Sequence, residues 1–384
     1  MKTVYLDNNA TTRVAPEVVD AMQPFFGEFY GNPSSMHYFG GQVARHVEAA
    51  RARVANLIGA DPSEIVFTSC GTESDNAAIL GAVEALGPAA RIITTRVEHQ
   101  AVLAPCRHLK EQGYDVVEID VDNAGQVDMA ALRAALHKSP CLVTVMWANN
   151  ETGTVFPLEE IARLTQAAGA VLHTDAVQTV GKIPVDVGSI PVDMLSLSGH
   201  KLHAPKGVGV LYVRRGTKVR PLLLGGHQEH GRRAGTENVP YIVGLGKACE
   251  LAAAGLDAER TRVAALRDRL EAGILERTTG TLVNGDRKNR LPNTTNVSFQ
   301  YIEGEAILYH LSDVGIAASS GSACTSGSLD VSHVLRAMGV PRDYAQGSIR
   351  FSLSRYNTAA EIDYVLAQLP PVVTRLRDLS PFVE

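Results

Sequence analysis

The residue whose setting most strongly suggests covalent chemistry is Lys201. It comes directly after a β-rich run, within the small polar stretch 196–203. A lysine in such a place is seldom buried without a partner, and desolvation lowers the pKa of its amine until it is nucleophilic. A nucleophilic lysine forms Schiff bases with carbonyl groups. For an isolated lysine, a solvated loop position is the more frequent alternative.

Four further polar residues, Thr72, His99, Asn150 and Asp175, follow other β-rich runs. Thr72 lies in a glycine-containing turn that opens a helix, which suits either anion binding or an ordinary helix cap. Asp175 suits a helix cap, a metal ligand or a partner for a protonated ring nitrogen, and a lone histidine is more often packed or solvated than catalytic. Because open α/β sheets bind ligands at the carboxyl ends of their strands, we expect these side chains to converge with Lys201.

Cysteine and histidine spacing argues against a structural metal or a disulfide framework. The five cysteines are widely spaced, odd in number and without a Cys-x-x-Cys pair. We therefore expect free thiols, most of them buried as small hydrophobic side chains. The pairs His200/His203 and His227/His230 have a spacing that a helix turns into metal ligands. Neither pair lies in a clear helix, so we expect no metal.

Composition narrows the class of protein. The chain has 384 residues, 45% of them hydrophobic, and a formal net charge of -5. This mild acidity disfavours nucleic acid or an anionic membrane surface as partner, since both need a clustered basic face. The longest apolar runs are far shorter than the ~20 residues of a spanning helix, and the N-terminus lacks a signal-peptide core. These features favour a cytoplasmic location.

The elements that must position these residues alternate between strand and helix patterns. Strands are expected at 65–68, 91–95, 116–119, 142–146, 171–174 and 193–197. Helical patterns such as 74–86 and 158–168 separate most of them, which predicts an α/β fold with a mostly parallel sheet covered on both faces. The run 207–213 follows without a long helix and is expected to be antiparallel. A long helix over 240–278 then leads into a small α+β domain, with strands at 295–299 and 348–353 and helices at 305–313, 331–338 and 359–369.

Several blocks of sequence resemble the NifS/IscS cysteine desulfurases of the class-V aminotransferase family. The matching blocks run almost end to end, at 5–12, 31–35, 71–76, 149–153, 173–178, 198–201, 319–327 and 349–355. The stretches 224–229 and 317–327 are most similar to the nitrogen-fixation, NifS branch. The resemblance implies the fold type I of pyridoxal 5'-phosphate (PLP) transferases, like aspartate aminotransferase. It implies a large PLP-binding domain over 15–255 and a small domain formed by 1–14 and 256–384.

The resemblance also assigns roles around PLP. Lys201 binds the cofactor covalently, Asp175 keeps the pyridine nitrogen protonated, Gln178 bonds the ring oxygen, and His99 stacks on the ring and transfers protons. Asn150 lies beside the cofactor. The phosphate is assigned to Gly71, Thr72, Ser198 and His200, with Thr236 reaching the phosphate of a partner subunit. A complete site then requires a homodimer.

Substrate residues follow from the same resemblance. Arg350, with Asn32 and Asn150, is assigned to the substrate carboxylate, which the bidentate guanidinium fork suits. Cys324 is the expected sulfur acceptor, and its small polar neighbours make an accessible thiol physically reasonable. Cys70, beside the phosphate turn, is the main rival, because a helix N-terminus lowers a thiol pKa. We interpret Cys70 as packed.

The implied reaction converts L-cysteine to L-alanine and leaves a persulfide on Cys324. An iron–sulfur scaffold of the NifU/IscU kind would then take the sulfur, in the nitrogen-fixation case for nitrogenase clusters. A selenocysteine lyase or another fold type I PLP enzyme, such as an aminotransferase, is the alternative. A third possibility is a non-catalytic sulfur carrier, which the intact set of Lys201, Asp175, His99 and Arg350 argues against.

Overall fold

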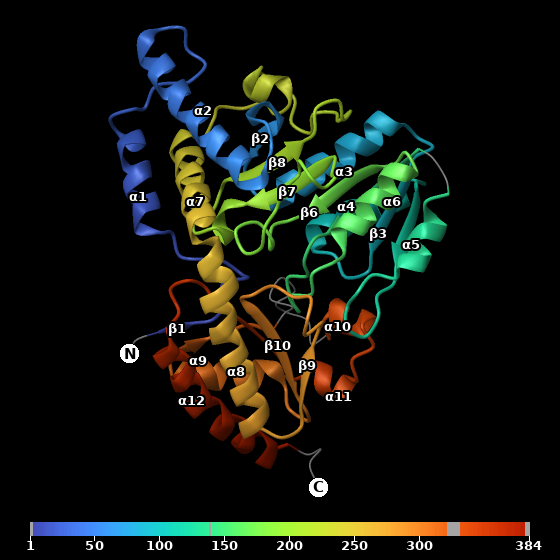
Figure 1. The fold of residues 1–384 in the computed structure, drawn as a ribbon, viewed down its shortest axis with the longest axis vertical. Helices are drawn as coiled ribbons and strands as arrows, with labels where there is room; N and C mark the ends of the chain where they lie inside the picture. The colour runs from blue at the N-terminus through green and yellow to red at the C-terminus, as the bar shows by residue number, and fades with distance from the viewer. Residues whose placement is uncertain (1–2, 138–139, 321–330, 381–384) are drawn as a thin grey trace.

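A seven-stranded sheet forms the centre of the larger half of the molecule (Figure 1). The computed structural model describes residues 3–137, 140–320 and 331–380. The sheet order is β2-β8-β7-β6-β5-β3-β4, and only β8 runs against the other strands. Its strands are β2 (Ile65–Thr68), β3 (Arg91–Thr95), β4 (Asp115–Ile119), β5 (Cys141–Met146), β6 (Val171–Asp175), β7 (Met194–Ser198) and β8 (Gly209–Val213). The mostly parallel sheet and its one antiparallel strand were predicted from the sequence.

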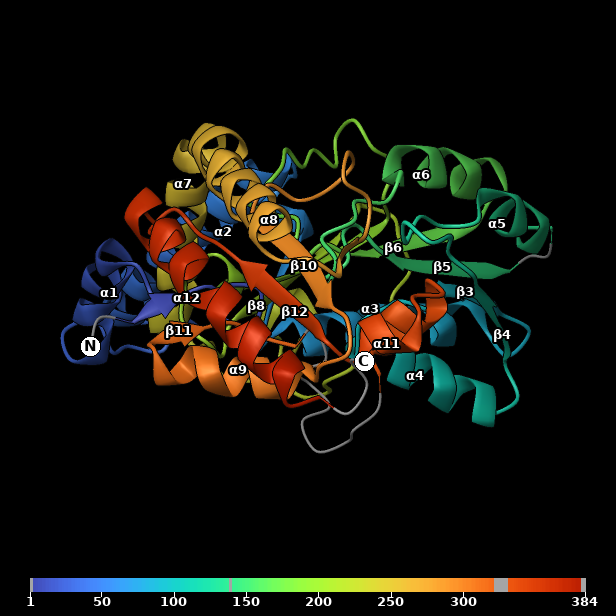
Figure 2. The same cartoon turned by 90° about the horizontal axis from the view of Figure 1, so that it is seen from below.

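Alternate residues of each strand enter two different cores. Ile92 and Leu142 pack with α3 (Gly71–Leu86) and α4 (Gln100–Glu111), whereas Ile93 and Val143 face the opposite side of the sheet. Because both faces are buried, the strands read as nearly continuous hydrophobic runs. Figure 2 shows the helices on both sides of the sheet. The opposite side is covered by α1 (Pro16–Met22), α2 (Tyr38–Ile58), α5 (Met129–Ala135), α6 (Leu158–Ala167) and α7 (Val239–Ala258).

One long helical stretch joins the two halves of the molecule. Helix α7 continues through a π-helical turn (Glu259–Val263) into α8 (Ala264–Arg277), close to the predicted 240–278. The stretch 239–277 is long and apolar enough to cross a membrane by length and composition, and half of its most apolar window is buried in the protein. The core helices of soluble proteins have the same character, and α7 packs closely on α2.

The smaller half has its own hydrophobic core around an antiparallel sheet. Its strands are β9 (Thr281–Asn284), β10 (Thr294–Phe299) and β12 (Ser348–Ser352), with β10 in the middle. Helices α8, α9 (Gly304–Asp313) and α12 (Ala359–Asp378) cover it. The N-terminal β1 (Val4–Tyr5) pairs with β11 (Ile316–Ala317), so Val4 and Leu6 enter this core.

Two features of the C-terminal region differ from the pattern expected of the sequence. Helix α12 continues through Pro370 and Pro371 to Asp378, because Leu369 and Val373 bury their side chains in the core and offset the lost backbone hydrogen bonds. Helices α10 (His333–Ala337) and α11 (Arg342–Ala345) contribute to the core of the larger half. The domain limits 15–255 and 256–384 stay predictions.

Candidate active site

A cavity of about 360 Å³ lies at the carboxyl edge of the large sheet. Its walls come from the ends of β5, β6 and β7, from the starts of α3 and α4, and from β12 of the smaller half. Ten of the predicted site residues line it: Gly71, Thr72, His99, Asn150, Asp175, Gln178, Ser198, His200, Lys201 and Arg350. The five residues that the strand-end argument placed together, Thr72, His99, Asn150, Asp175 and Lys201, therefore line one cavity with five that the family resemblance assigned.

Lys201 lies in a single 3-10 turn, Gly199–Lys201, directly after β7. Its Nζ donates hydrogen bonds to the carbonyl oxygen of Asn9 and, at 2.8 Å, to that of Ala10. Thr12 holds the same turn by donating from Oγ1 to the carbonyl of His200 at 2.9 Å. The N-terminal peptide thus positions the lysine, and no local pattern in the sequence indicated that role for residues 9–12.

The first turn of α3 forms an anion cradle beside Lys201. The N-cap of this helix is Cys70, which makes no side-chain capping bond, so the alternative of Thr72 as a cap is wrong. A Cβ at Gly71 would lie 2.9 Å from Val177 Cγ2, so glycine keeps the backbone accessible. The buried Ser198 Oγ has no hydrogen-bond partner among the described atoms. These features fit a phosphate group.

His200 is suited to donate a hydrogen bond as a neutral imidazole. Burial, reinforced by the charges of Lys201, Lys206 and Lys182, lowers the pKa of His200 to about 4. Its Nδ1 lies 3.2 Å from Thr11 Oγ1. Near neutral pH this side chain adds no positive charge to the cradle.

Asp175 ends β6 and is 8% exposed. Its Oδ1 accepts a hydrogen bond from the Val177 N–H at 2.9 Å. Burial raises the pKa of this carboxyl, and the charges of His99 and Lys201 oppose the rise. No helix starts at Asp175, and the described residues contain no group of three His, Cys, Asp or Glu side chains that could hold a metal. The arrangement favours pairing with a cationic nitrogen over a cap or a metal ligand.

His99 and Gln178 present polar atoms to the same cavity. His99 is the N-cap of α4, and its Nδ1 accepts from the Ala101 N–H at 3.1 Å. The proton of a neutral His99 ring is therefore on Nε2. Gln178 donates from Nε2 to the Asn9 carbonyl at 3.0 Å, while its buried Oε1 has no partner among the described atoms.

Arg350 enters the cavity from β12 and is 3% exposed. It donates from Nη1 to the Asn150 carbonyl and from Nη2 to Asp7 Oδ1, both at 2.9 Å. Its buried Nε has no partner among the described atoms. The fixed guanidinium suits a substrate carboxylate. Asp7 was not anticipated, because a separation of 343 residues leaves no local signal.

Two of the other predicted site residues, Asn32 and Thr236, do not line this cavity. Asn32 is exposed, and its Oδ1 accepts from the Ser34 N–H. Thr236 lines a separate cavity of about 150 Å³ together with Arg233. Cys324 lies outside the described residues.

The remaining cysteines separate into two groups. Burial raises the pKa values of Cys106, Cys141 and Cys249 to about 12, 11 and 12, so these thiols are packed as expected. Cys70 is partly buried and lines the cavity, so its thiol is less enclosed than the packed side chain that we expected. Cys70 is the N-cap residue of α3, at the edge of the cavity, and its side chain makes no capping hydrogen bond.

Two buried carboxyls near the cavity escaped the sequence analysis. Asp75 lines the cavity and is 1% exposed, and burial together with the charge of Asp175 raises its pKa well above the ordinary value. Glu98, fully buried, accepts from Thr95 Oγ1 at 2.7 Å and from the Met146 N–H at 2.8 Å. Burial raises its pKa to about 8. Their helix and strand-end positions were visible, but burial of a charged side chain was not.

The match to known families supports the same conclusion as the geometry. Residues 4–365 match the family described as aminotransferase class-V. The chain belongs to this family. Enzymes of this family depend on PLP.

Similar proteins identify the activity within the class-V family. A cysteine desulfurase of Trichormus azollae is 60% identical over 382 residues, which cover 100% of this chain and 96% of that protein. The cysteine desulfurase NifS of Azotobacter vinelandii is 59% identical and is covered to 95%. The solved structure of a NifS-like protein has a TM-score of 0.92 and 42% identity, covering 97% of this chain and all of that one. This class-V protein is a cysteine desulfurase, and the resemblance drawn from the sequence blocks is confirmed.

Proposed function

We propose that the cavity binds PLP through Lys201 and takes L-cysteine as its substrate. The observation that carries this proposal is the convergence of a lysine amine, a buried carboxyl and an uncapped helix start on one cavity. The unpartnered Ser198 Oγ and Gln178 Oε1 add polar atoms that a cofactor phosphate and ring oxygen would use. A solved relative described as SspA in complex with cysteine, 36% identical with a TM-score of 0.82, supports cysteine as the ligand class.

Each side chain then has a definite task. When bound, PLP supplies an electron sink for negative charge at the substrate Cα. The Asp175 carboxylate pairs with the ring nitrogen, while Gly71, Thr72, Ser198 and His200 hold the phosphate. Arg350, next to Asn150, orients the substrate carboxylate. Lys201 Nζ would take the Cα proton, and His99, which lines the same cavity, would move a further proton.

Sulfur transfer is assigned to Cys324. Its thiolate attacks the substrate sulfur, so an S–S bond forms while the substrate Cβ–S bond breaks. The electron pair of the broken bond stays on carbon, and protonation of Cβ gives the methyl group of L-alanine. Cys324 keeps the sulfur as a persulfide.

Two measurements test these assignments. The first compares alanine and sulfide release from L-cysteine by the wild type and by Cys324→Ala, which should lose at least about 100-fold in alanine release. Full alanine production by the variant would refute the role of Cys324. The second is the absorption band of the lysine-bound cofactor, which should vanish in Lys201→Ala. A persisting band would remove Lys201 from its role.

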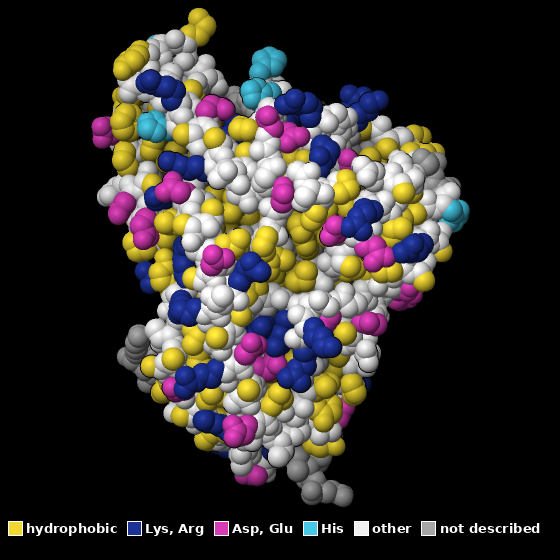
Figure 3. Space-filling model, viewed as in Figure 1, with side chains coloured by type: hydrophobic (Ala, Val, Ile, Leu, Met, Phe, Trp, Pro, Cys, Tyr) yellow, Lys and Arg dark blue, Asp and Glu magenta, His cyan; other side chains and the backbone are white. Residues whose placement is uncertain are grey.

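We further infer a homodimer in which the partner supplies Thr236, and Asn32, to this site. Both residues lie outside the cavity of the single chain. Large exposed hydrophobic side chains lie near them in the sequence, at Phe26, Tyr30, Met36, Tyr38 and Leu224. Figure 3 shows hydrophobic side chains gathered over the outer end of α2. Sedimentation at micromolar concentration should give a dimer, and Thr236→Ala should weaken PLP retention.

The sulfur acceptor rests on resemblance. We propose an iron–sulfur scaffold of the NifU/IscU kind in the cytoplasm, with assembly of nitrogenase clusters as the purpose. Transfer of labelled persulfide sulfur from this enzyme to purified scaffolds of both kinds measures the preference. Equal transfer to both would argue against a dedicated nitrogen-fixation role.

A further inference from the structure

The chain on the two sides of residues 321–330 packs in different cores. Before this segment, Ile316 belongs to the core of the smaller half, and Ser319 exchanges backbone hydrogen bonds with Arg350 at 3.2 and 2.6 Å. After it, Val334 and Leu335 of α10 belong to the core of the larger half. The segment that carries Cys324 therefore connects the two halves of the enzyme, and Figure 1 shows α10 where these halves meet.

Ser332, which follows this segment in the chain, is hydrogen-bonded to a buried carboxyl. The Ser332 hydroxyl donates to Glu151 Oε2 at 2.5 Å, and Glu151 is 3% exposed. The same hydroxyl accepts from the N–H groups of Val334 and Leu335 at 3.1 and 3.3 Å. Because both acceptor positions are used, the hydroxyl proton must point to Glu151.

A second bond fastens the next residue. His333 donates from Nε2 to the carbonyl of Glu98 at 3.0 Å. Glu98 precedes His99, and Glu151 follows Asn150, whose carbonyl accepts from Arg350. Each anchor point is thus one residue away from the wall of the cavity. Burial raises the pKa of Glu151, while the bond from Ser332 and the charges of His333, Arg350 and His99 oppose the rise.

We propose that Glu151 is a positioning residue for sulfur transfer, which acts by holding Ser332 and with it the end of the segment that carries Cys324. This inference rests on the proposed role of Cys324 as sulfur acceptor. It predicts that breaking the Glu151–Ser332 bond slows the attack on the substrate sulfur. Cofactor binding, substrate binding and removal of the Cα proton should stay unchanged.

The experiment separates proton removal from sulfur transfer in the PLP-loaded enzyme. Stopped-flow absorbance of the cofactor after mixing with L-cysteine reports substrate binding and Cα proton removal, and quenched samples report alanine. Ser332→Ala should leave the absorbance change within about two-fold of wild type and lower alanine formation about 10- to 100-fold. Glu151→Gln keeps an acceptor oxygen for Ser332, and its rate of alanine formation should fall between those of the wild type and Ser332→Ala. Ser332→Thr keeps the hydroxyl and should restore the rate.

Glu271 offers a matched control. It is another buried glutamate, 2% exposed, that accepts from a hydroxyl, Thr295 Oγ1, at 2.7 Å, but it lies in α8 away from the cavity. Glu271→Gln should change thermal stability, but it should not lower alanine formation relative to the absorbance change of the cofactor.

Three results would overturn the proposal. They are unchanged alanine formation in Ser332→Ala, equal loss in both measurements, and the same pattern in Glu271→Gln. Full alanine production by Cys324→Ala would instead remove the proposed role of Cys324. The two failures are therefore distinguishable.

Discussion

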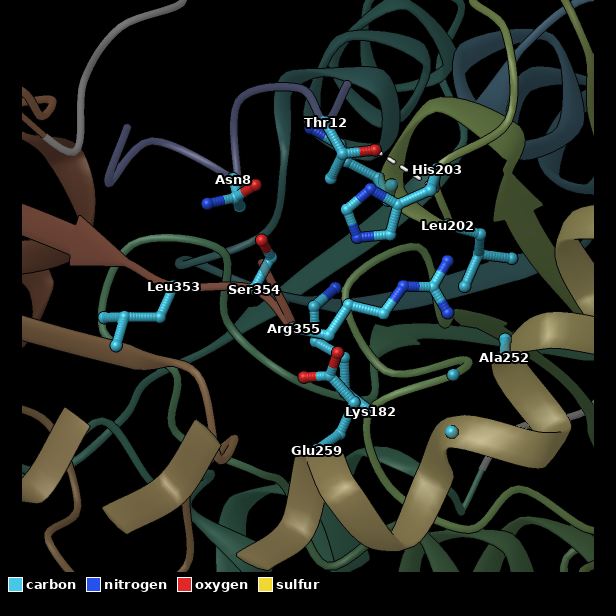
Figure 4. A pocket seen from close by; sticks show the side chains of 13 residues that line it. Asn8, Thr12, Lys182, Leu202, His203, Ala252, Glu259, Leu353, Ser354 and Arg355 are labelled. Atoms are coloured by element: carbon cyan, nitrogen blue, oxygen red, sulfur yellow. Dashed lines mark hydrogen bonds between the residues drawn. The ribbon is translucent and has the colours of Figure 1, made fainter. Parts of the chain in front are cut away.

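Lys201 lies between two polar cavities that both contain buried ionisable side chains. In front of it, the active-site cavity contains the carboxyls of Asp75 and Asp175. Behind it, a much smaller cavity of about 20 Å³ is lined by Lys182, Glu259 and basic side chains. Figure 4 shows that rear cavity, with Lys182 and Glu259 beside Arg355. Lys201 lines both cavities.

Burial drives the ionisable groups of both cavities toward neutrality. In front, it raises the pKa values of Asp75 and Asp175 and brings that of the neighbouring Glu98 to about 8. Behind, it lowers the pKa of Lys182 to about 8 and that of His203 to about 4. Desolvation is the largest cause in each case.

The two cavities differ in the partners that can offset the cost of burying charged and polar groups. Behind Lys201, Lys182 has the charge of Glu259 close by, although its Nζ makes no hydrogen bond within the described protein. In front, polar atoms without partners face a cavity large enough for a cofactor. The active-site cavity therefore suits an external ligand that supplies both a cationic nitrogen and anionic groups. In the rear cavity, the cost of burying charge has to be offset within the fold itself.

The largest effect should come from neutralising Asp175, the carboxyl that we propose pairs with the ring nitrogen of PLP. Asp175→Asn should lower kcat for alanine formation by about 10²- to 10³-fold and shift the absorbance of bound PLP. Asp75→Asn is the matched control, because Asp75 lines the same cavity and burial raises its pKa well above the ordinary value. Similar losses of kcat in both variants would mean that Asp175 has no role in catalysis that Asp75 lacks. Steady-state kinetics and absorbance spectra give the comparison.

Part of the active-site cavity was predictable from the sequence pattern, because five of its residues follow strands, and the family resemblance supplied the others. The runs at 65–68 and 91–95 coincide with β2 and β3, since strands buried on both faces are marked by continuous hydrophobic residues. The strand-end rule then collects Asp175, Asn150 and Lys201 at one edge. Cys324 was selected by resemblance to a family, because its spacing alone does not distinguish it from four other cysteines.

The rest depends on contacts between distant parts of the chain. Asn9 and Ala10 hold Lys201 across about 190 residues, and Asp7 holds Arg350 across 343. No periodicity indicates where an N-terminal peptide will lie. The rear cavity was missed for the same reason, since Lys182 and Glu259 are ordinary surface residue types until tertiary packing buries them.

A buried acid near the front should make stability fall as pH rises. Glu98 has an ordinary pKa near 4.5 and a folded pKa of about 8, so the folded state keeps a proton that the unfolded state has lost between these values. Folding stability therefore decreases from pH 5 to 8, by roughly 3 kcal/mol for this group. In Glu98→Gln the amide oxygen can still accept from the Met146 N–H, and the Thr95 hydroxyl, which donates in the wild type, would turn to accept from the amide nitrogen. Because glutamine does not ionise, this variant should remove the decrease.

Thermal unfolding of the wild type and Glu98→Gln at pH 5, 6, 7 and 8 measures this effect. The two midpoints should be close at pH 5, and the variant should be increasingly more stable above it. Parallel curves at all four values would show that Glu98 is ionised in the folded protein. Glu98, beside the active-site cavity, would then be charged in a pH range in which we expect it to be neutral.

The smallest effect, opposite in sign, should come from the rear. Lys182 has an ordinary pKa of 10.5 and a folded pKa of about 8, so between these values the unfolded state binds more protons. Stability then rises with pH across this window. Lys182→Met removes a buried ammonium without a hydrogen bond and should stabilise the protein by about 1–2 kcal/mol at pH 7. The gain should shrink toward pH 10, where the wild-type amine becomes neutral.

Glu259→Gln is the companion variant for this rear pair. It removes the charge that favours Lys182 and should destabilise the protein at pH 7, less so at pH 10. Unfolding midpoints of the wild type and both variants at pH 7 and pH 10 give the four changes in stability. If Lys182→Met were destabilising at pH 7, the rear charges would contribute to stability through their pairing. Only the active-site cavity would then contain buried charges that no partner in the fold compensates. The two cavities on either side of Lys201 would differ more than their similar burial suggests.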